Sequence, residues 1–299
     1  MLARSAEALF TGLIDYAGLF PPAALSMEDA VRNYNAYRRG EFAWMLGKFV
    51  VTAQRVEEVF ACHPERSEGS PPILPGDPSP SAQRVEECGG GLQPAPGRAE
   101  ARPHVLMTDL SVLGIHPDAD TIEAKATNAD EIEAIASRTE GKTVYIELTD
   151  LSLLDAVAQH GLRAKIRTGG VTADAFPNAK AIADFIRACA ERGVAFKATA
   201  GLHHPVRCVK PLTYDADAPR GTMHGFVNVF LAAALPGLAE EILLDDDPRS
   251  FSFEDDAASW RGNRVATETL RELRQTFAIS FGSCSFEEPV ADLKELGWL

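Results

Sequence analysis

Two lysines on neighbouring predicted strands are the strongest chemical signal in the sequence. Lys165 lies in the segment RAKIRT and Lys197 lies in the segment AFKATA, at matching depths. An amine beside a second cation loses its proton more easily, because the charged form is disfavoured. A neutral lysine amine can attack a carbonyl carbon and form a Schiff base. The pair therefore indicates covalent chemistry on a small carbonyl compound.

Other ionisable side chains share a face with these two lysines. Side chains on a strand alternate between its two faces. The alternation places four pairs on one face: Glu123 with Lys125, Tyr145 with Glu147, Lys165 with Arg167, and Lys197 with Thr199. Buried charges are costly unless they are paired, and barrel interiors are usually filled by branched apolar residues. The cluster therefore favours an active site over a structural lattice of ion pairs, with Glu123 as general acid or base.

Short apolar segments that alternate with amphipathic stretches position these residues. The candidate strands are 12–17, 47–52, 110–114, 121–126, 143–148, 163–168, 195–200 and 277–282, and the candidate helices are 27–39, 129–138, 151–160, 178–192 and 265–275. This order predicts an α/β fold, specifically a (β/α)8 TIM barrel that forms one domain over residues 1–299. An open doubly wound sheet is the alternative, although no GxGxxG motif follows the first strand.

Two segments depart from the regular alternation. Residues 62–103 hold nine of the 19 prolines. A short repeat, AQRVEE, precedes them at 53–58 and recurs within them at 82–87. Such a composition cannot bury enough apolar surface to order itself, so we expect a disordered insertion that folding does not require. Residues 203–276 form a long connection between the seventh and eighth strands. We expect this connection to be an elaborated loop or a small subdomain, with an apolar helix near 224–235.

Composition excludes several classes of protein. The net charge of −14 disfavours nucleic acid as a partner. No run of 18 apolar residues and no signal peptide are found, so membrane insertion is not expected. Five cysteines without a CxxC motif fit a reducing cytoplasm. Cys284 has no histidine near it in the sequence, and it is not expected to act as a nucleophile.

The motifs around the two lysines resemble those of the deoxyribose-phosphate aldolases. KIRTGG and ERGVAFKATAGL are similar to that family's paired lysine motifs, which implies that Lys165 forms the Schiff base and that Lys197 favours its neutral amine. TVYIELTDL, ADTIEAK and GLIDYAGL are similar to the family's strand segments that carry acidic residues. The resemblance places those residues at Glu147, Glu123 and Asp15.

The resemblance also implies an anion-binding loop near the end of the chain. FAISFGSCSF is similar to the family's phosphate loop. The residues implied for an anion are Gly169, Gly201, Gly282, Ser283 and Ser285, while Glu147, Lys125, Arg167, Thr199 and His203 are expected to contact substrate. Gly170 and His203 replace a lysine and an arginine that help the family to hold phosphate. We therefore expect a smaller or differently charged carbonyl substrate.

The sequence as a whole predicts a class I aldolase or lyase without a metal or cofactor. A metal-assisted barrel enzyme, in which Glu123 and Glu147 hold Mg²⁺, is one alternative. A barrel that binds a small molecule without catalysis is another, with the lysines in plain ion pairs. The partner of Glu123 distinguishes these alternatives. An ion pair between Glu123 and Lys165 keeps that amine charged, which weakens the Schiff-base hypothesis. A second copy of the chain is the one macromolecular partner left open.

Overall fold

The computed structural model describes residues 2–61, 105–108, 119–148 and 150–299. The expected insertion at 62–103 and the expected third strand at 110–114 lie outside the described residues. The third strand that the structure does describe is slightly earlier in the chain, at Val105–Thr108. None of the helices formed by the described residues is long and apolar enough to cross a membrane.

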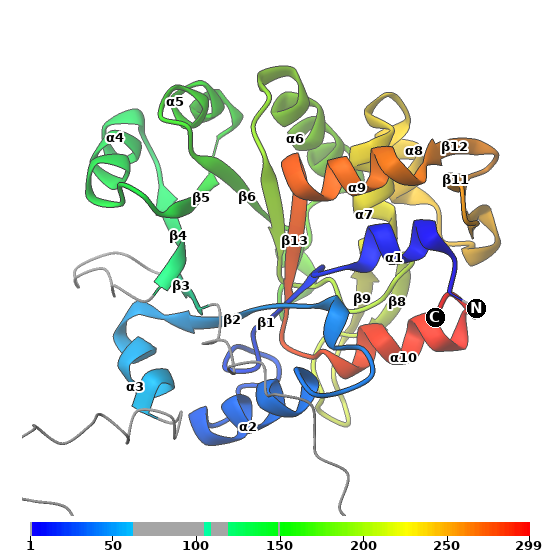
Figure 1. Cartoon of the computed structure of the whole chain (residues 1–299), viewed down its shortest axis with the longest axis horizontal. Coiled ribbons are helices and arrows are strands. Elements are labelled where there is room, and N and C mark those ends of the chain that lie inside the picture. The colour runs from blue at the N-terminus through cyan, green and yellow to red at the C-terminus, as the bar shows by residue number, and fades with distance from the viewer. Residues whose placement is uncertain (1, 62–104, 109–118, 149) are drawn as a thin grey trace, which may run out of the picture.

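Eight parallel strands form a curled sheet at the centre of the molecule (Figure 1). They are β1 (Ile14–Tyr16), β2 (Leu46–Thr52), β3 (Val105–Thr108), β4 (Ala119–Ala126), β5 (Thr143–Leu148), β6 (Arg163–Arg167), β7 (Phe196–Thr199) and β13 (Ala278–Ser283). Their order is β1-β13-β7-β6-β5-β4-β3-β2, and β1 also pairs with β2. The expected α/β class with a curled parallel sheet is confirmed.

Helices connect the strands and pack on the outer side of the sheet. They are α1 (Arg4–Phe10), α2 (Met27–Tyr37), α3 (Val56–Ala61), α4 (Ala129–Arg138), α5 (Leu154–Gln159), α6 (Ala179–Arg192), α9 (Thr267–Thr276) and α10 (Glu287–Glu295). Polar side chains begin three of them, because Ser26, Asn128 and Asn178 each accept a hydrogen bond from a first-turn amide. Gly193 ends α6 with φ of 64°, a left-handed conformation that favours glycine.

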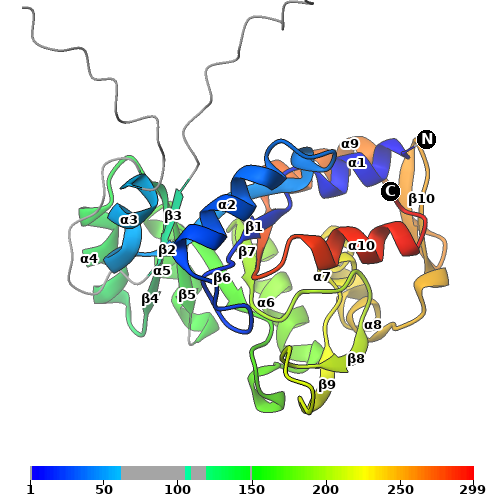
Figure 2. The same cartoon turned by 90° about the horizontal axis from the view of Figure 1, so that it is seen from below.

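The segment from 203 to 276 carries most of the additional structure. A hairpin pairs β8 (Cys208–Pro211) with β9 (Arg220–Met223), and a small antiparallel sheet joins β10 (Phe251–Phe253), β11 (Ala257–Trp260) and β12 (Asn263–Ala266). Between them lie α7 (Phe226–Ala234) and α8 (Ala239–Leu244). Within the apolar α7, Asn228 donates to the carbonyl oxygens of Ile242 and Asp245 at 2.6 and 2.8 Å. These bonds tie α7 to the end of α8 (Figure 2).

The expected alternation along the strands is present. Ile122, Ile146, Ala164 and Ala198 are buried, and they belong to the apolar core between the sheet and the helices. Phe196 on β7 packs edge-on against Phe185 of α6, with ring centroids 5.4 Å apart. The residues between these apolar positions therefore face the interior of the curled sheet, where the ionisable side chains gather.

Candidate active site

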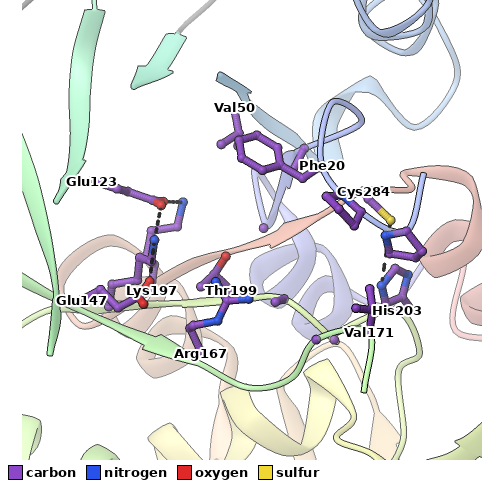
Figure 3. Close-up of a pocket in the computed structure, with 18 of the residues that line it drawn as sticks. Phe20, Val50, Glu123, Glu147, Arg167, Val171, Lys197, Thr199, His203 and Cys284 are labelled. Atoms are coloured by element: carbon purple, nitrogen blue, oxygen red, sulfur yellow. Dashed lines mark hydrogen bonds and ion pairs between the residues drawn. The ribbon is translucent and has the colours of Figure 1, made fainter. Parts of the chain in front are cut away.

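A cavity of about 460 Å³ opens where the central strands end. Its size suits a small organic molecule. One side is apolar, with Phe20, Pro21, Pro22 and Val50, and the other side carries the charged residues of β4 to β7 (Figure 3). Active sites of α/β folds form at this carboxyl end of the strands, so the cavity has the expected position.

The two lysines lie side by side at the base of the cavity. The Cα atoms of Lys165 and Lys197 are register partners on β6 and β7, so the predicted matching depth is confirmed. Lys165 Nζ lies 2.6 Å from Glu123 Oε2 and 3.0 Å from Glu147 Oε2. Lys197 Nζ lies 2.7 Å from Glu123 Oε1 and 2.7 Å from Asp15 Oδ2. Five side chains therefore form one continuous network of ion pairs.

The side chains of the two lysines differ in how far they are exposed. The side chain of Lys197 is 1% exposed and that of Lys165 is 10% exposed. Burial alone would lower the pKa of Lys197, but the charges of Asp15 and Glu123 outweigh burial and raise it. Lys197 therefore stays charged. Both lysines line the cavity, and Lys165 is the more exposed of the two.

Glu123 is the centre of the network. Burial alone would raise the pKa of this carboxyl group, but the charges of Lys197 and Lys165 and their hydrogen bonds hold the pKa at about 2. Glu123 is therefore an anion at all physiological pH values. A carboxyl group with so low a pKa is a poor proton carrier at neutral pH.

Carboxylates surround both lysines. Glu123 bridges the two side chains, and three carboxylates face two ammonium groups. The expected repulsion between the lysines is therefore opposed by the attraction of these carboxylates. An ion pair between Glu123 and Lys165, the contact on which the sequence argument depends, is present.

Asp15 lies beneath the cavity and does not line it. Its Oδ2 contacts Lys197 and accepts a 2.7 Å hydrogen bond from Ser280, and its Oδ1 accepts one of 2.8 Å from the Lys48 backbone amide. A Cβ atom at Gly47 would clash with Asp15 Oδ1 and crowd the backbone of Ile14, so glycine is favoured there. Asp15, expected to be catalytic, therefore reaches the cavity only through its contact with Lys197.

All five residues expected to contact substrate line the cavity. Lys125, Arg167, Thr199 and His203 all line it, together with Glu147. Lys125 and Arg167 are exposed, and neither forms an ion pair with any other residue that the structure describes. The rim thus offers two cations to an anionic group.

The glycines and serines expected to bind an anion divide into two groups. Gly201 and Gly282 line the cavity. Gly169 instead packs against Phe176, whose ring would clash with a Cβ atom there. The two serine hydroxyl groups accept hydrogen bonds from backbone amides. Ser283 Oγ accepts from the Ser285 amide at 3.3 Å, and Ser285 Oγ accepts from the Glu288 amide, in the first turn of α10, at 3.1 Å. The loop after β13 is therefore held by its own hydroxyl groups.

A second cluster in the cavity wall was missed by the sequence reasoning. His203 Nε2 lies 4.0 Å from Cys284 Sγ, and His203 Nδ1 lies 2.9 Å from Glu288 Oε2. Tyr214 donates to Glu288 at 2.9 Å. His203 and Cys284 are 81 positions apart in the chain, and no local motif connects them. The available signal was that Cys284 directly follows the strand β13 and that His203 lies four residues after the end of β7.

The carboxylates of Glu123, Glu147 and Asp15 all form ion pairs with Lys165 or Lys197. Lys165 Nζ lies between Glu123 and Glu147, at the position where a bridging cation would bind. Among the described residues, no group of three His, Cys, Asp or Glu side chains is arranged to hold a metal ion. The metal-assisted alternative therefore finds no ready ligand set in this part of the chain.

Comparison with known proteins identifies no relative. No family model, no curated protein and no solved structure matches the chain. The function must therefore be argued from the geometry of the cavity and its side chains.

Proposed function

We propose that the protein is a class I aldolase or lyase, which makes or breaks a C–C bond of a small carbonyl compound through a Schiff base on Lys165. One observation carries the proposal. Lys165 Nζ borders a cavity of ligand size and contacts a carboxylate, Glu147, which lines the same cavity. A reachable amine beside a cavity-facing proton acceptor is the minimum that imine chemistry requires.

The reaction follows from this arrangement. The Lys165 amine adds to the carbonyl carbon, and the carbinolamine loses water to give an iminium ion. The bond between the carbon α to the iminium and the hydroxyl-bearing β carbon then breaks, and its electron pair forms an enamine. The β-hydroxyl group gives its proton to a base, and the β fragment leaves as an aldehyde or ketone. Protonation of the enamine at carbon and addition of water release the product and the free amine.

Glu147 is the residue best placed to move these protons. Its side chain is 17% exposed and its Oε2 lies 3.0 Å from Lys165 Nζ. Glu123, which we expected to be the acid or base, is shared between two ammonium groups and has a pKa of about 2. We therefore assign proton transfer to Glu147. Glu123 then holds the two lysines in place.

The charges at the rim favour a substrate with one anionic group. Lys125 and Arg167 offer two cations at the cavity entrance. Phe20 and Val50 offer an apolar wall on the other side. A keto acid or a short aldehyde acid matches both features, and a neutral aldehyde satisfies only the second.

The same proposal extends to the protein's family and setting. We propose that the curled sheet is a complete (β/α)8 barrel of the deoxyribose-phosphate aldolase-like superfamily and that the enzyme acts in the cytoplasm. The paired lysines on adjacent strands, with Glu123 between them, support the family assignment.

Borohydride trapping tests the proposal. The protein is incubated with a panel of keto acids and aldehydes, reduced, and weighed by mass spectrometry. We expect an adduct in the wild type and in Lys125→Arg, which keeps a rim cation, and none in Lys165→Arg, because a guanidinium cannot form the imine. Equal trapping in all three proteins would contradict the proposal.

One observation favours a second candidate function, binding without catalysis. Both buried lysines are held in ion pairs, as expected for a cavity that only recognises a ligand. In that case keto acids would raise the melting temperature, and no carbonyl compound would be trapped by borohydride at any pH between 6 and 10.

A further inference from the structure

Cys284, His203 and Glu288 form a chain of contacts in the wall of the cavity. The thiol Sγ lies 4.0 Å from His203 Nε2, and His203 Nδ1 lies 2.9 Å from Glu288 Oε2. A nucleophile, a base and a group that orients the base occur in this order in thiol and serine enzymes. The S···N distance is long for a hydrogen bond, as such contacts often are without substrate.

Three separate parts of the chain bring this cluster together. Cys284 follows β13, His203 follows β7, and Glu288 lies in the first turn of α10. Tyr214, in the turn between β8 and β9, donates to Glu288 at 2.9 Å and lies 3.8 Å from Cys284 Sγ. Cys284 and His203 both line the cavity, on the side away from Glu123 and Lys197 (Figure 3).

The local charges favour an imidazolium beside the thiol. Burial alone would lower the pKa of His203, but Cys284 and Glu288 raise it to about 9. Burial alone would raise the pKa of Glu288, but the hydrogen bond from His203 lowers it. An imidazolium next to a cysteine stabilises the thiolate, which is the nucleophilic form.

We propose that Cys284, His203 and Glu288 form a second nucleophilic centre, which adds the Cys284 thiolate to the electrophilic carbon of a small aldehyde bound in the cavity. The centre shares the cavity with Lys165 and does not depend on Schiff-base formation. An experiment can therefore contradict the addition of an aldehyde to Cys284 without contradicting Schiff-base formation on Lys165, and the reverse also holds.

The step is a reversible addition. The Cys284 sulfur forms a bond to the carbonyl carbon, and the π electrons of the C=O bond move to oxygen. The oxygen takes the proton from His203 Nε2, which leaves a neutral imidazole and a thiohemiacetal. Glu288 holds the His203 ring in position from Nδ1 throughout.

Iodoacetamide alkylation of the full-length native protein tests the nucleophile, with peptide mapping to follow each cysteine. Cys208 is an internal control, because it is more exposed than Cys284 and burial raises its pKa to about 11. At pH 7.5 we expect Cys284 to react at least about tenfold faster than Cys208. A faster reaction at Cys208 would overturn the proposal.

Variants test the role of the histidine and the carboxylate. We expect His203→Asn to slow alkylation of Cys284 by about tenfold or more, and Glu288→Gln to slow it by a smaller factor. His204→Asn is the matched control, because His204 is the next residue and pairs with Asp292 at 2.6 Å. Each variant's melting temperature is compared with that of the wild type. If a variant melts early, the pH dependence of alkylation in the wild type replaces it. A thiolate already paired with an imidazolium at pH 7.5 gains little reactivity at pH 10.5, whereas Cys208 gains much because its thiol ionises in that range. A Cys284 rate that rises as steeply as the Cys208 rate between the two pH values would overturn the proposal.

Protection by propanal separates the two nucleophiles. We expect millimolar propanal to slow alkylation of Cys284 several-fold both in the wild type and in Lys165→Arg. Protection that disappears in Lys165→Arg would show that the aldehyde acts through an imine, and no protection in either protein would show that it does not reach the thiol. Both results would overturn the assignment of an aldehyde to Cys284.

Discussion

Replacement of Glu147 by Gln is the most informative change to the proposed proton path. The amide keeps the size of the side chain and removes one negative charge 3.0 Å from Lys165 Nζ. Lys165 retains its contact with Glu123 at 2.6 Å. The substitution therefore changes the charge around Lys165 while the rest of the network is retained.

The size of the effect follows from this distance. Two unit charges 3.0 Å apart attract each other by about 5 kcal/mol at an effective dielectric constant of roughly 20. Solvent screening at the 17% exposed Glu147 side chain reduces this attraction. We expect the pH of half-maximal borohydride trapping to fall, because the substitution removes one of the two carboxylates that contact the amine. The limiting rate at high pH should also fall, by about 100-fold, because the proton acceptor is lost.

The assay is the initial rate of trapping with one keto acid between pH 5 and 10. Asp155→Asn is the control, because Asp155 pairs with Arg192 on the surface and its side chain is 75% exposed. We expect the control profile to coincide with that of the wild type. A Glu147→Gln profile with an unchanged or higher midpoint would refute the assignment of Glu147.

Three further outcomes follow from the ion-pair network. Glu123 has a pKa of about 2 against an ordinary value of 4.5, so its contribution of about 3 kcal/mol to stability is complete above pH 4.5 and is lost as the pH falls toward 2. Urea unfolding at pH 6 and pH 3 measures the loss, which should be smaller in Glu123→Gln because the contribution of this carboxyl group is then missing. Lys197→Met leaves Glu123 without one partner and Asp15 without its ammonium, and should cost about 3–5 kcal/mol in urea unfolding, whereas Lys180→Met on the surface should cost under about 1 kcal/mol. Dialysis against EDTA should leave the melting temperature and the trapping rate unchanged, and a loss of either would favour the metal-assisted alternative.

Seven of the eight central strands could be located from the sequence, all except β3, because a simple period governs them. Apolar residues such as Ile122 and Ile146 alternate with Glu123 and Glu147, and this period of two identified both the strand and its inner face. The register of adjacent strands then followed from the requirement that the charged residues share one interior. Lys165 and Lys197 are accordingly register partners.

The pairing of the charges could not be predicted in the same way. Whether Glu123 contacts Lys165, Lys197 or both depends on side-chain torsions and on distances of a few ångströms. The sequence only shows that these residues share a face. The contact between His203 and Cys284 likewise depends on how two loops, 81 positions apart in the chain, approach each other at the end of the sheet.

Peptide mapping of the borohydride-reduced adduct tests the central claim most directly. The wild-type protein is reduced in the presence of a keto acid, digested, and sequenced by tandem mass spectrometry. We expect the added mass on Lys165, in the peptide that contains the β6 segment RAKIR. An adduct on Lys197 would reverse the roles of the two lysines. An adduct on Lys125 alone, or none with any carbonyl compound, would contradict the proposed Schiff-base chemistry.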